Sequence, residues 1–445
     1  MKYKPYPEYK DSGVEWLGEV PEHWCVSKLK HVAPFQVGWT PPTKDDSNFD
    51  GENLWANISD LKSKYITDTA KKISDNAAMI ASMDISPKGS LLYSFKLSVG
   101  AVSFASKDMY TNEAIASFLE GGSLPLKYLY YALPKFVVEN ASTNIYGARI
   151  LNQELINNAL LLIPSGEEAE QIANFLDHET AKIDTLIEKQ QQLIKLLKEK
   201  RQAVISHAVT KGLNPDVPMC DSGVEWLGEV PEHWENITLK LVTRTRKGVA
   251  FKSVDFCDNG IRVVKASDIK QKTIRAAEVF LPESFVSEYP KAQLSSGDII
   301  LSTVGSNPDV KNSAVGQIGM VPKELNGALL NQNTVIFDPD ETKVIREYLF
   351  YILQMDAYRD HLDLNAHGTA NQSSLNIADI LNFHISIPPV NEQHRICADL
   401  RRQQEKLQRL ELRSQESETL LKERRTALIS AAVTGEIDER SHNKS

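Results

Sequence analysis

The chain has 445 residues, of which 42% are hydrophobic and 24% charged, and its formal net charge is −9. A chain of this length exceeds one ordinary hydrophobic core, which predicts several compact units, and its composition excludes an intrinsically disordered protein. The negative charge excludes a protein that coats nucleic acid indiscriminately, because such binding depends on many Lys and Arg contacts to phosphates. Any contact with DNA must therefore come from a locally basic surface.

The sequence contains no run of eighteen apolar residues, and the opening MKYKPYPEYK lacks the apolar core of a secretion signal. We therefore expect a cytoplasmic protein with no membrane partner. Its four cysteines are Cys25, Cys220, Cys257 and Cys397. They are scattered and form no C-x-x-C motif, which predicts free thiols rather than disulfides or a zinc site.

The first recognisable element is DSGVEWLGEVPEHW at residues 11–24, which returns unchanged at residues 221–234. Fainter pairs follow along the chain: ISDLK at 58–62 with ASDIK at 266–270, GSLLYS at 89–94 with GDIILS at 297–302, and YLYYAL at 128–133 with YLFYIL at 348–353. The distance between paired segments changes from 210 to 208, then 220, and reaches 224 residues for 197–212 and 421–436. The chain is therefore an internal duplication whose insertions lie in the middle of each half.

The regions between the repeated blocks, about 25–160 and 235–385, mix short β-like runs with helical patterns and frequent Gly and Pro. Each region is large enough for one α+β domain. We expect an N-terminal domain at 1–163, a conserved helix at 164–212, a C-terminal domain at 213–387, and a second helix with a tail at 388–445.

Two long helices are predicted by heptad patterns in the repeated blocks. Ser165 and Glu168 form a predicted capping box at the first helix, and Gly212 and Gly435 follow the last turns. The apolar a and d positions predicted to pair the helices are Ile172, Leu176, Ile183, Leu186, Leu193, Leu197, Val204, Ile396, Leu400, Leu407, Leu410, Leu421 and Leu428. These stripes could pack on each other or on their own globular halves. Their equal length and matched polar breaks favour an antiparallel coiled coil, with the two halves related by a pseudo-twofold axis.

Catalytic motifs are missing from the sequence. It has no G-x-x-x-x-G-K-[ST] loop, no H-E-x-x-H helix and no G-x-G-x-x-G turn after a strand. The segment PDETK at 339–343 resembles the carboxylate and lysine set of metal-dependent nucleases, but Asp340 and Glu341 are adjacent in one predicted turn. A surface turn explains them better, and the chain is interpreted as a recognition module.

Local charge points to DNA in the second half, where residues 240–275 hold ten Lys and Arg against three Asp. Arg and Lys contact phosphates and guanine edges, and Asn and Gln can bond adenine. An ordinary solvated basic face and simple turn formation remain alternatives for these segments. The candidate DNA-binding residues are Trp39, Thr40, Lys44, Lys96, Arg149, Arg244, Arg246, Lys247, Lys252, Asn371 and Gln372.

The repeated DSGVEWLGEVPEHW, the helix ends AVISHAVTKG and ALISAAVTGE and the helix start EQIANFL resemble the specificity subunit of type I restriction-modification systems. The resemblance covers almost the whole chain. It implies two target-recognition domains, each reading one half of a bipartite double-stranded DNA site, and no catalysis or cofactor in this chain. It also implies two modification subunits that use S-adenosylmethionine to methylate adenine, and two restriction subunits that use ATP and magnesium.

The same resemblance makes the repeated segments a docking surface for two identical partners, with Trp16, Trp24, Trp226 and Trp234 as candidates. Two alternatives stay open. One is a self-contained restriction or methyltransferase enzyme, and the other is a coiled-coil scaffold without a DNA role.

Overall fold

The computed structural model describes residues 4–96, 98–143, 149–270, 272–275, 278–306, 313–369, 372–438 and 440. Two compact units divide the chain. Unit 1 comprises Met1–Gln190 with Glu416–Ser445, and unit 2 comprises Gln191–Gln415. Each of the two long helices is therefore shared between the units, so that each unit contains the beginning of one helix and the end of the other.

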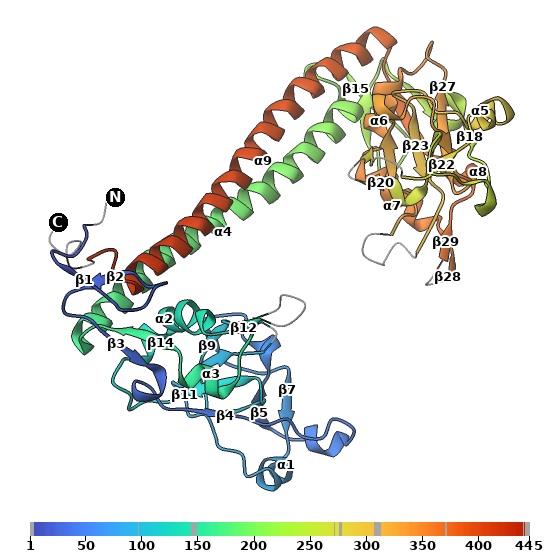
Figure 1. Cartoon of the computed structure of the whole chain (residues 1–445). Coiled ribbons are helices and arrows are strands. Elements are labelled where there is room, and N and C mark those ends of the chain that lie inside the picture. The colour runs from blue at the N-terminus through green and yellow to red at the C-terminus, as the bar shows by residue number, and fades with distance from the viewer. Residues whose placement is uncertain are drawn as a thin grey trace. The chain divides into compact units, whose positions relative to one another are not determined.

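Unit 1 combines short strands with helices (Figure 1). Its five-stranded sheet has the order β4 (Phe35–Val37), β11 (Ile115–Phe118), β8 (Leu91–Ser94), β9 (Val102–Ala105) and β6 (Tyr65–Ile66). A three-stranded sheet has the order β10 (Tyr110–Thr111), β5 (Asn53–Ala56) and β7 (Lys71–Ile73). Three two-stranded ribbons pair β1 (Tyr9–Asp11) with β2 (Glu19–Pro21), β3 (Cys25–Lys28) with β14 (Leu160–Ile163), and β12 (Ser142–Thr143) with β13 (Arg149–Ile150). The helices are α1 (Asp75–Ile80), α2 (Leu126–Glu139), α3 (Gln153–Asn157) and the first part of α4 (Gly166–Lys211).

Unit 2 has a six-stranded sheet of order β18 (Thr243–Lys247), β27 (Thr334–Pro339), β23 (Ile299–Ser302), β25 (Ile318–Met320), β21 (Thr273–Ile274) and β20 (Ile269–Lys270). Two three-stranded sheets have the orders β22 (Phe280–Leu281), β19 (Ile261–Val264), β26 (Leu329–Leu330) and β24 (Val304–Gly305), β29 (Gln372–Ser374), β28 (His367–Thr369). Ribbons pair β15 (Met219–Asp221) with β16 (Glu229–Pro231) and β17 (Glu235–Thr238) with β30 (His384–Ile387). The helices are α5 (Ser284–Glu288), α6 (Arg346–Ile352), α7 (Asp356–Leu364), α8 (Ile377–Leu381) and the first part of α9 (Val390–Val433).

The main sheets of the two units share one strand order. In unit 1, β4, β11, β8, β9 and β6 are neighbours, and in unit 2 the strands β18, β27, β23, β25 and β21 follow in the same order. The pairing senses also match, because β6 joins β9 in parallel and β21 joins β25 in parallel, while the other pairs are antiparallel. The α+β class and the duplication predicted from the sequence are thus confirmed at the level of topology.

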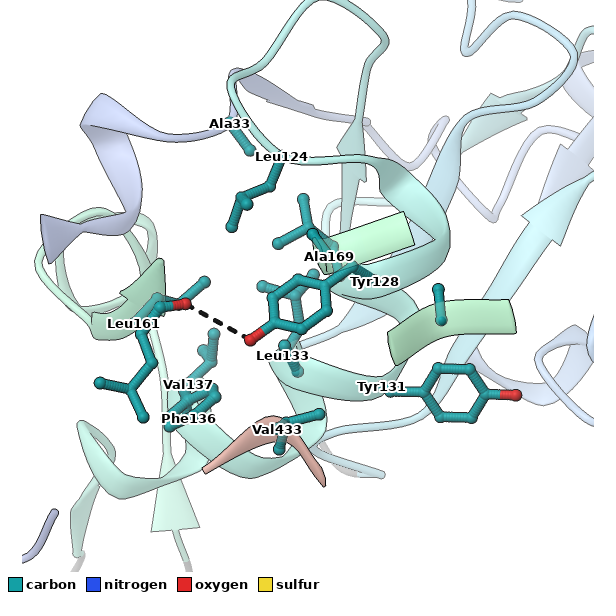
Figure 2. Close-up of a cluster of buried hydrophobic side chains, with 14 of the residues drawn as sticks. Ala33, Leu124, Tyr128, Tyr131, Leu133, Phe136, Val137, Leu161, Ala169 and Val433 are labelled. Atoms are coloured by element: carbon teal, nitrogen blue, oxygen red, sulfur yellow. Dashed lines mark hydrogen bonds between the residues drawn. The ribbon is translucent and has the colours of Figure 1, made fainter. Parts of the chain in front are cut away.

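The main core of unit 1 is formed where sheet, helices and ribbon meet (Figure 2). Tyr128 of α2 packs in one cluster with Leu161 of β14, Ala169 of α4 and Val433 of α9, and its hydroxyl donates to the carbonyl of Leu162 at 3.4 Å. Unit 2 has a matching core, in which α4 and α9 residues pack with β23, β27 and α6. The long helices are therefore anchored in the globular cores, and burial of these apolar side chains is the main force that holds them there.

The ends of the long helices agree with the capping signals. The hydroxyl of Ser165 accepts a hydrogen bond from the amide of Glu168 at 3.2 Å, and α4 begins at the next residue, Gly166. Gly212 and Gly435 have φ of +75°, the left-handed conformation that glycine tolerates after a last helical turn. Among the described residues, no helix is long and apolar enough to cross a membrane.

Candidate functional site

The first copy of the repeated segment, residues 11–24, contacts the start of α4 and the end of α9 in unit 1. Nε2 of His23 lies 2.9 Å from Oε2 of Glu168, in the first turn of α4. Trp24 is fully buried, and a side chain at Gly435, just after α9, would place its Cβ 3.2 Å from the Trp24 ring. This copy therefore connects the start of α4 to the end of α9.

The second copy makes the equivalent contacts in unit 2 with the helices exchanged. Nε2 of His233 lies 2.8 Å from Oε2 of Glu392, in the first turn of α9. A Cβ at Gly212, just after α4, would lie 3.3 Å from the Trp234 ring. The identity of the two copies thus has an intramolecular cause: each must fit the start of one helix and the end of the other.

In the predicted capping box the Glu168 carboxylate was expected to bond the Ser165 amide, but it lies beside His23 instead.

The four tryptophans expected to dock partners fall into two classes. Trp16 and Trp226 are 42% and 38% exposed, and each lies against one phenylalanine: Trp16 against Phe136 at 6.0 Å between ring centroids, and Trp226 stacked on Phe383 at 4.7 Å. Trp24 and Trp234 are only 0% and 5% exposed. Including Trp24 and Trp234 in a docking surface was wrong, because their side chains are buried inside the chain.

The predicted helix-pairing positions are buried only in part. Ile172, Leu176 and Ile183 belong to the core of unit 1 together with Leu428. Ile396 and Leu400 belong to the core of unit 2, and Leu197 is buried as well. Val204, Leu407 and Leu421 are half-buried. Both packing alternatives therefore hold at the helix ends, where one cluster combines residues of both helices and of the globular part.

Leu186, Leu193 and Leu410 correct the heptad prediction, since their side chains are 46%, 42% and 41% exposed. Ile187 and Ile194 are half-buried in place of Leu186 and Leu193. An α-helix has 3.6 residues per turn, so a straight helix drifts away from a strict seven-residue pattern by about 20° per heptad, or about half a residue position over two to three heptads. The prediction extended the pattern without this drift.

Charged side chains connect the long helices within each unit. In unit 1, the guanidinium of Arg425 donates to both carboxylate oxygens of Asp184, at 2.8 and 3.3 Å. In unit 2, Nη2 of Arg201 donates to Oε2 of Glu411 at 2.7 Å. Bidentate or charge-assisted hydrogen bonds of this kind fix the register between neighbouring helices more than they add stability.

The DNA-binding candidates of unit 1 lie on separate surface segments. Trp39 is 37% exposed and its carbonyl accepts from the indole of Trp55, while the hydroxyl of Thr40 donates to Glu113. Lys44, Lys96 and Arg149 are exposed. These three basic side chains are thus accessible to solvent.

In unit 2, the edge strand β18 carries three of the candidates. Arg244 and Lys247 are exposed, as is Lys252 beyond the strand. Arg246 differs, because its Nε donates to Asp338 at 2.6 Å and its Nη1 donates to the carbonyl of Lys291 at 2.6 Å. These contacts leave Arg246 a structural role, so it is a poor DNA contact. Asn371 and the side chain of Gln372 lie outside the described residues.

The segment PDETK forms the turn expected from the sequence. The carboxylate of Asp340 accepts from the amide and the hydroxyl of Thr342, at 3.1 and 2.6 Å. These hydrogen bonds lower the pKa of the Asp340 carboxyl. Among the described residues, no group of three or more His, Cys, Asp or Glu is placed to hold a metal ion.

Two lysine sites, one of them an ion pair, escaped the sequence analysis. In unit 1, Nζ of Lys64 lies 2.6 Å from Oδ1 of Asp177, which also accepts from the hydroxyl of Tyr131 at 2.5 Å. In unit 2, Nζ of Lys272 donates to Oε1 of Gln202 at 3.4 Å. Burial and the neighbouring carboxylate raise the pKa of Tyr131, whereas partial burial lowers the pKa of Lys272. The repeats ISDLK and ASDIK precede both lysines and could have drawn attention to them.

Comparisons with known proteins give one consistent result. A family model described as the type I restriction modification DNA specificity domain matches residues 21–196 and again residues 231–415. The MjaVIII specificity subunit, a type I restriction enzyme subunit of Methanocaldococcus jannaschii, is 26% identical over 388 residues, covering 86% of each chain. The EcoBI specificity subunit of Escherichia coli is 25% identical over 279 residues, covering 61% of this chain and 57% of that protein.

Two solved structures are similar in fold. One comes from work on the complex assembly and conformational transition of the type I R-M system; it has a TM-score of 0.72 and 16% identity, and the alignment covers 94% of this chain and 99% of that chain. The other is the HsdS subunit from Thermoanaerobacter tengcongensis, with a TM-score of 0.53, 16% identity, and coverage of 94% and 98%. At these identities the likeness concerns the fold.

Proposed function

Because this chain belongs to the type I restriction-modification DNA specificity family, we propose that it binds a bipartite double-stranded DNA site, with one half-site read by each globular unit. The observation that carries the proposal is the shared strand order of two sheets whose sequences have diverged. A duplicated DNA-binding domain whose two copies have different surfaces suits two half-sites of different base sequence. Paired readers on DNA engage half-sites at a fixed spacing that follows the geometry of the protein.

The spacing between the half-sites is set, in this proposal, by α4 and α9 pairing as one antiparallel coiled coil. Support comes from contacts inside each unit. In unit 2, Arg201 of α4 bonds Glu411 of α9, whereas Gly212, just after the end of α4, lies near Glu392, earlier in α9. The two helices have 46 and 44 residues, or roughly 65 to 70 Å at 1.5 Å per residue. A pseudo-twofold relation between the halves follows from such a pairing.

Contact with DNA phosphates falls to exposed basic side chains, because the whole chain is acidic. In unit 2 we assign Arg244, Lys247 and Lys252 to this role, since all three are exposed and lie on or beside one edge strand. In unit 1 the exposed Lys44, Lys96 and Arg149 are the counterparts by function. Base recognition requires further side chains of the same surfaces.

Catalysis belongs, in this proposal, to partner subunits. Two modification subunits would supply adenine methylation with S-adenosylmethionine, and two restriction subunits would supply cleavage with ATP and magnesium, in the cytoplasm. The duplicated ribbons with the half-exposed Trp16 and Trp226 support a docking role, because they present the same side chain twice. A complex with two copies of a partner needs such a repeated contact.

The test is to map methylated adenines in cells that carry the modification subunit with and without this chain. A split motif with a constant gap, present only with this chain, is expected. Exchanging residues 213–387 for the same region of a relative should change one half of the motif and keep the other half and the gap. Methylation or cleavage by the purified chain alone would overturn the proposal in favour of a self-contained enzyme. DNA affinity that is unaffected by substituting Arg244 and Lys247 would favour a scaffold.

A further inference from the structure

Each unit contains a groove where its globular part meets the long helices. Groove 1, in unit 1, is lined by residues 61–64, by α2, by Asp177 and Asp184 of α4, and by Arg425 of α9, and its volume is about 460 Å³. Groove 2, in unit 2, is lined by Lys272, by α6, by Gln404 and Gln408 of α9, and by Arg201 of α4, and its volume is about 1210 Å³. The second groove is therefore much the larger.

The two grooves are copies of one feature. Lys64 and Lys272 are 208 residues apart, Tyr131 and Tyr351 are 220 apart, and both Asp184 with Gln408 and Arg201 with Arg425 are 224 apart. These are the distances that align the two halves of the sequence. Each groove is thus built from equivalent positions, and differences between them are substitutions in a common frame.

In groove 1, two cationic side chains form ion pairs with carboxylates that line the same groove. Lys64 pairs with Asp177 at 2.6 Å, and Arg425 holds Asp184 with two hydrogen bonds. Lys64 also lies over the rings of Tyr130 and Tyr131, at 5.2 and 5.8 Å from their centroids. Lys64 and Arg425 are therefore both paired with carboxylates of α4.

Groove 2 lacks both of these carboxylates. The position equivalent to Asp177 is Arg401, and the position equivalent to Asp184 is Gln408. Arg201 bonds Glu411 instead. Within the described part of the chain, no carboxylate oxygen lies within 4.0 Å of the Lys272 ammonium, which donates to the amide oxygen of Gln202 at 3.4 Å. Lys272 is thus retained without the close carboxylate that its equivalent Lys64 has, and the Asp356 carboxylate acts on it only from a greater distance.

The backbone also singles out Lys272. Its φ is +64°, in the left-handed region that L-residues with side chains rarely occupy. Strained conformations of this kind persist where the surrounding structure enforces them, and they gather at functional positions. Although Lys272 is exposed to solvent, partial desolvation by the groove walls lowers the pKa of its ammonium, an effect that the Asp356 carboxylate opposes. An approaching anion would relieve that cost.

We propose that groove 2 binds an acidic segment of a partner polypeptide, with a carboxylate of that segment beside Lys272 in the place that Asp177 takes beside Lys64 in groove 1. The inference rests on the proposed function, and it assigns this segment to a modification subunit. A peptide fits better than a DNA phosphate for two reasons. The equivalent cations in groove 1 are matched by side-chain carboxylates, and the apolar Phe350 and Leu412 that line groove 2 would pack against the side chains of a peptide but not against a phosphodiester.

The consequence is an asymmetry between the two docking sites. One copy of the partner would insert an acidic segment into groove 2. The other copy would face groove 1, where Lys64 and Arg425 are already paired with Asp177 and Asp184. Two identical subunits would then bind with different affinities, in contrast to the equal docking expected from the repeated segments alone.

The test uses the full chain and the modification subunit of the same system, titrated with native mass spectrometry as the readout. Lys272→Glu should weaken binding of one of the two copies by about tenfold at low salt, and Lys272→Arg should retain it. Lys323→Glu, which changes an exposed lysine of unit 2 that does not line groove 2, is the matched control and should leave partner binding unchanged. Equal partner affinities for Lys272→Glu and the wild type would overturn the inference, as would a Lys272→Glu variant that loses DNA affinity alone.

A second titration separates this inference from the proposed function. The full chain is titrated with a hexaglutamate peptide, which needs no modification subunit. Tighter binding by the wild type and the Lys323→Glu variant than by Lys272→Glu supports the groove even if the modification subunit fails to bind. Equal peptide binding by all three overturns the groove while leaving the proposed function standing.

Discussion

Units 1 and 2 share a scaffold but differ at the edge of the main sheet. The edge strand β4 of unit 1 has three residues, FQV, whereas the equivalent β18 of unit 2 has five, TRTRK. Gly38 and Gly248 follow these strands in equivalent positions, and at both a Cβ would collide with a backbone carbonyl, at 1.8 Å from Thr111 and 1.9 Å from Asn331. The backbone course is thus preserved by steric necessity while the side chains diverge. The comparison teaches that packing constraints hold the frame, and that the exposed edges are free to acquire different recognition surfaces.

The largest effect on the free energy of unfolding is expected where the repeated segment anchors the long helices. Trp24→Ala should lower the free energy of unfolding by about 3–5 kcal/mol, because a fully buried indole leaves a large cavity. Urea unfolding followed by circular dichroism measures it. Trp16→Ala, which removes a 42% exposed side chain, is the control and should cost much less. Equal losses for the two variants would contradict the assignment of Trp24 to the core.

The two helix-ending glycines offer a sharper comparison between the units. Gly435→Ala should cost about 2–4 kcal/mol, because φ is +75° and the new Cβ would lie 2.5 Å from Pro21. Gly212→Ala has the same φ but a nearest contact of 3.3 Å, so only the conformational penalty of about 1–2 kcal/mol is expected. Thermal unfolding of both variants checks the order. A larger loss for Gly212→Ala would show that the contacts at the two helix ends are not as described.

Within β18, neighbouring arginines should separate stability from binding. Arg246→Ala should lower the free energy of unfolding by about 1–2 kcal/mol, since it leaves Asp338 and the carbonyl of Lys291 without their donor. Arg244→Ala should leave stability unchanged and reduce the salt dependence of DNA binding by about one phosphate contact. Unfolding curves and DNA titrations at several salt concentrations are the measurements. If Arg246→Ala weakened DNA binding without loss of stability, its structural assignment would be wrong.

The smallest effect concerns thiol chemistry, which distinguishes the core of unit 2 from exposed cysteines. Burial raises the pKa of the Cys397 thiol to about 12. Because the thiolate is the reactive form, alkylation of Cys397 by iodoacetamide at pH 8 should be at least about tenfold slower than that of the exposed Cys25 and Cys257. Mass spectrometry of the labelled chain gives the rates. Equal rates in mild urea would report opening of the core around α9.

The sequence by itself determined the duplication, the α+β class and both ends of α4, since repeats, periodicity and caps are local patterns. Gly212 and Gly435 marked the helix ends because a left-handed residue there needs no distant partner. The family resemblance, too, rested on short segments that can be read without a structure.

Only the tertiary structure decided which side chains are available. Arg244 and Arg246 look alike in sequence, yet Arg246 is held by Asp338, which is 92 residues away. Leu186 lies in a plausible heptad and is exposed, because the real helix drifts from the ideal repeat. His23 pairs with Glu168, and Lys272 bonds Gln202 in place of a carboxylate. Both contacts join residues that are far apart in the chain. The physical reason is common to all of them: burial and counter-charge are properties of neighbours in space, which a local pattern does not specify.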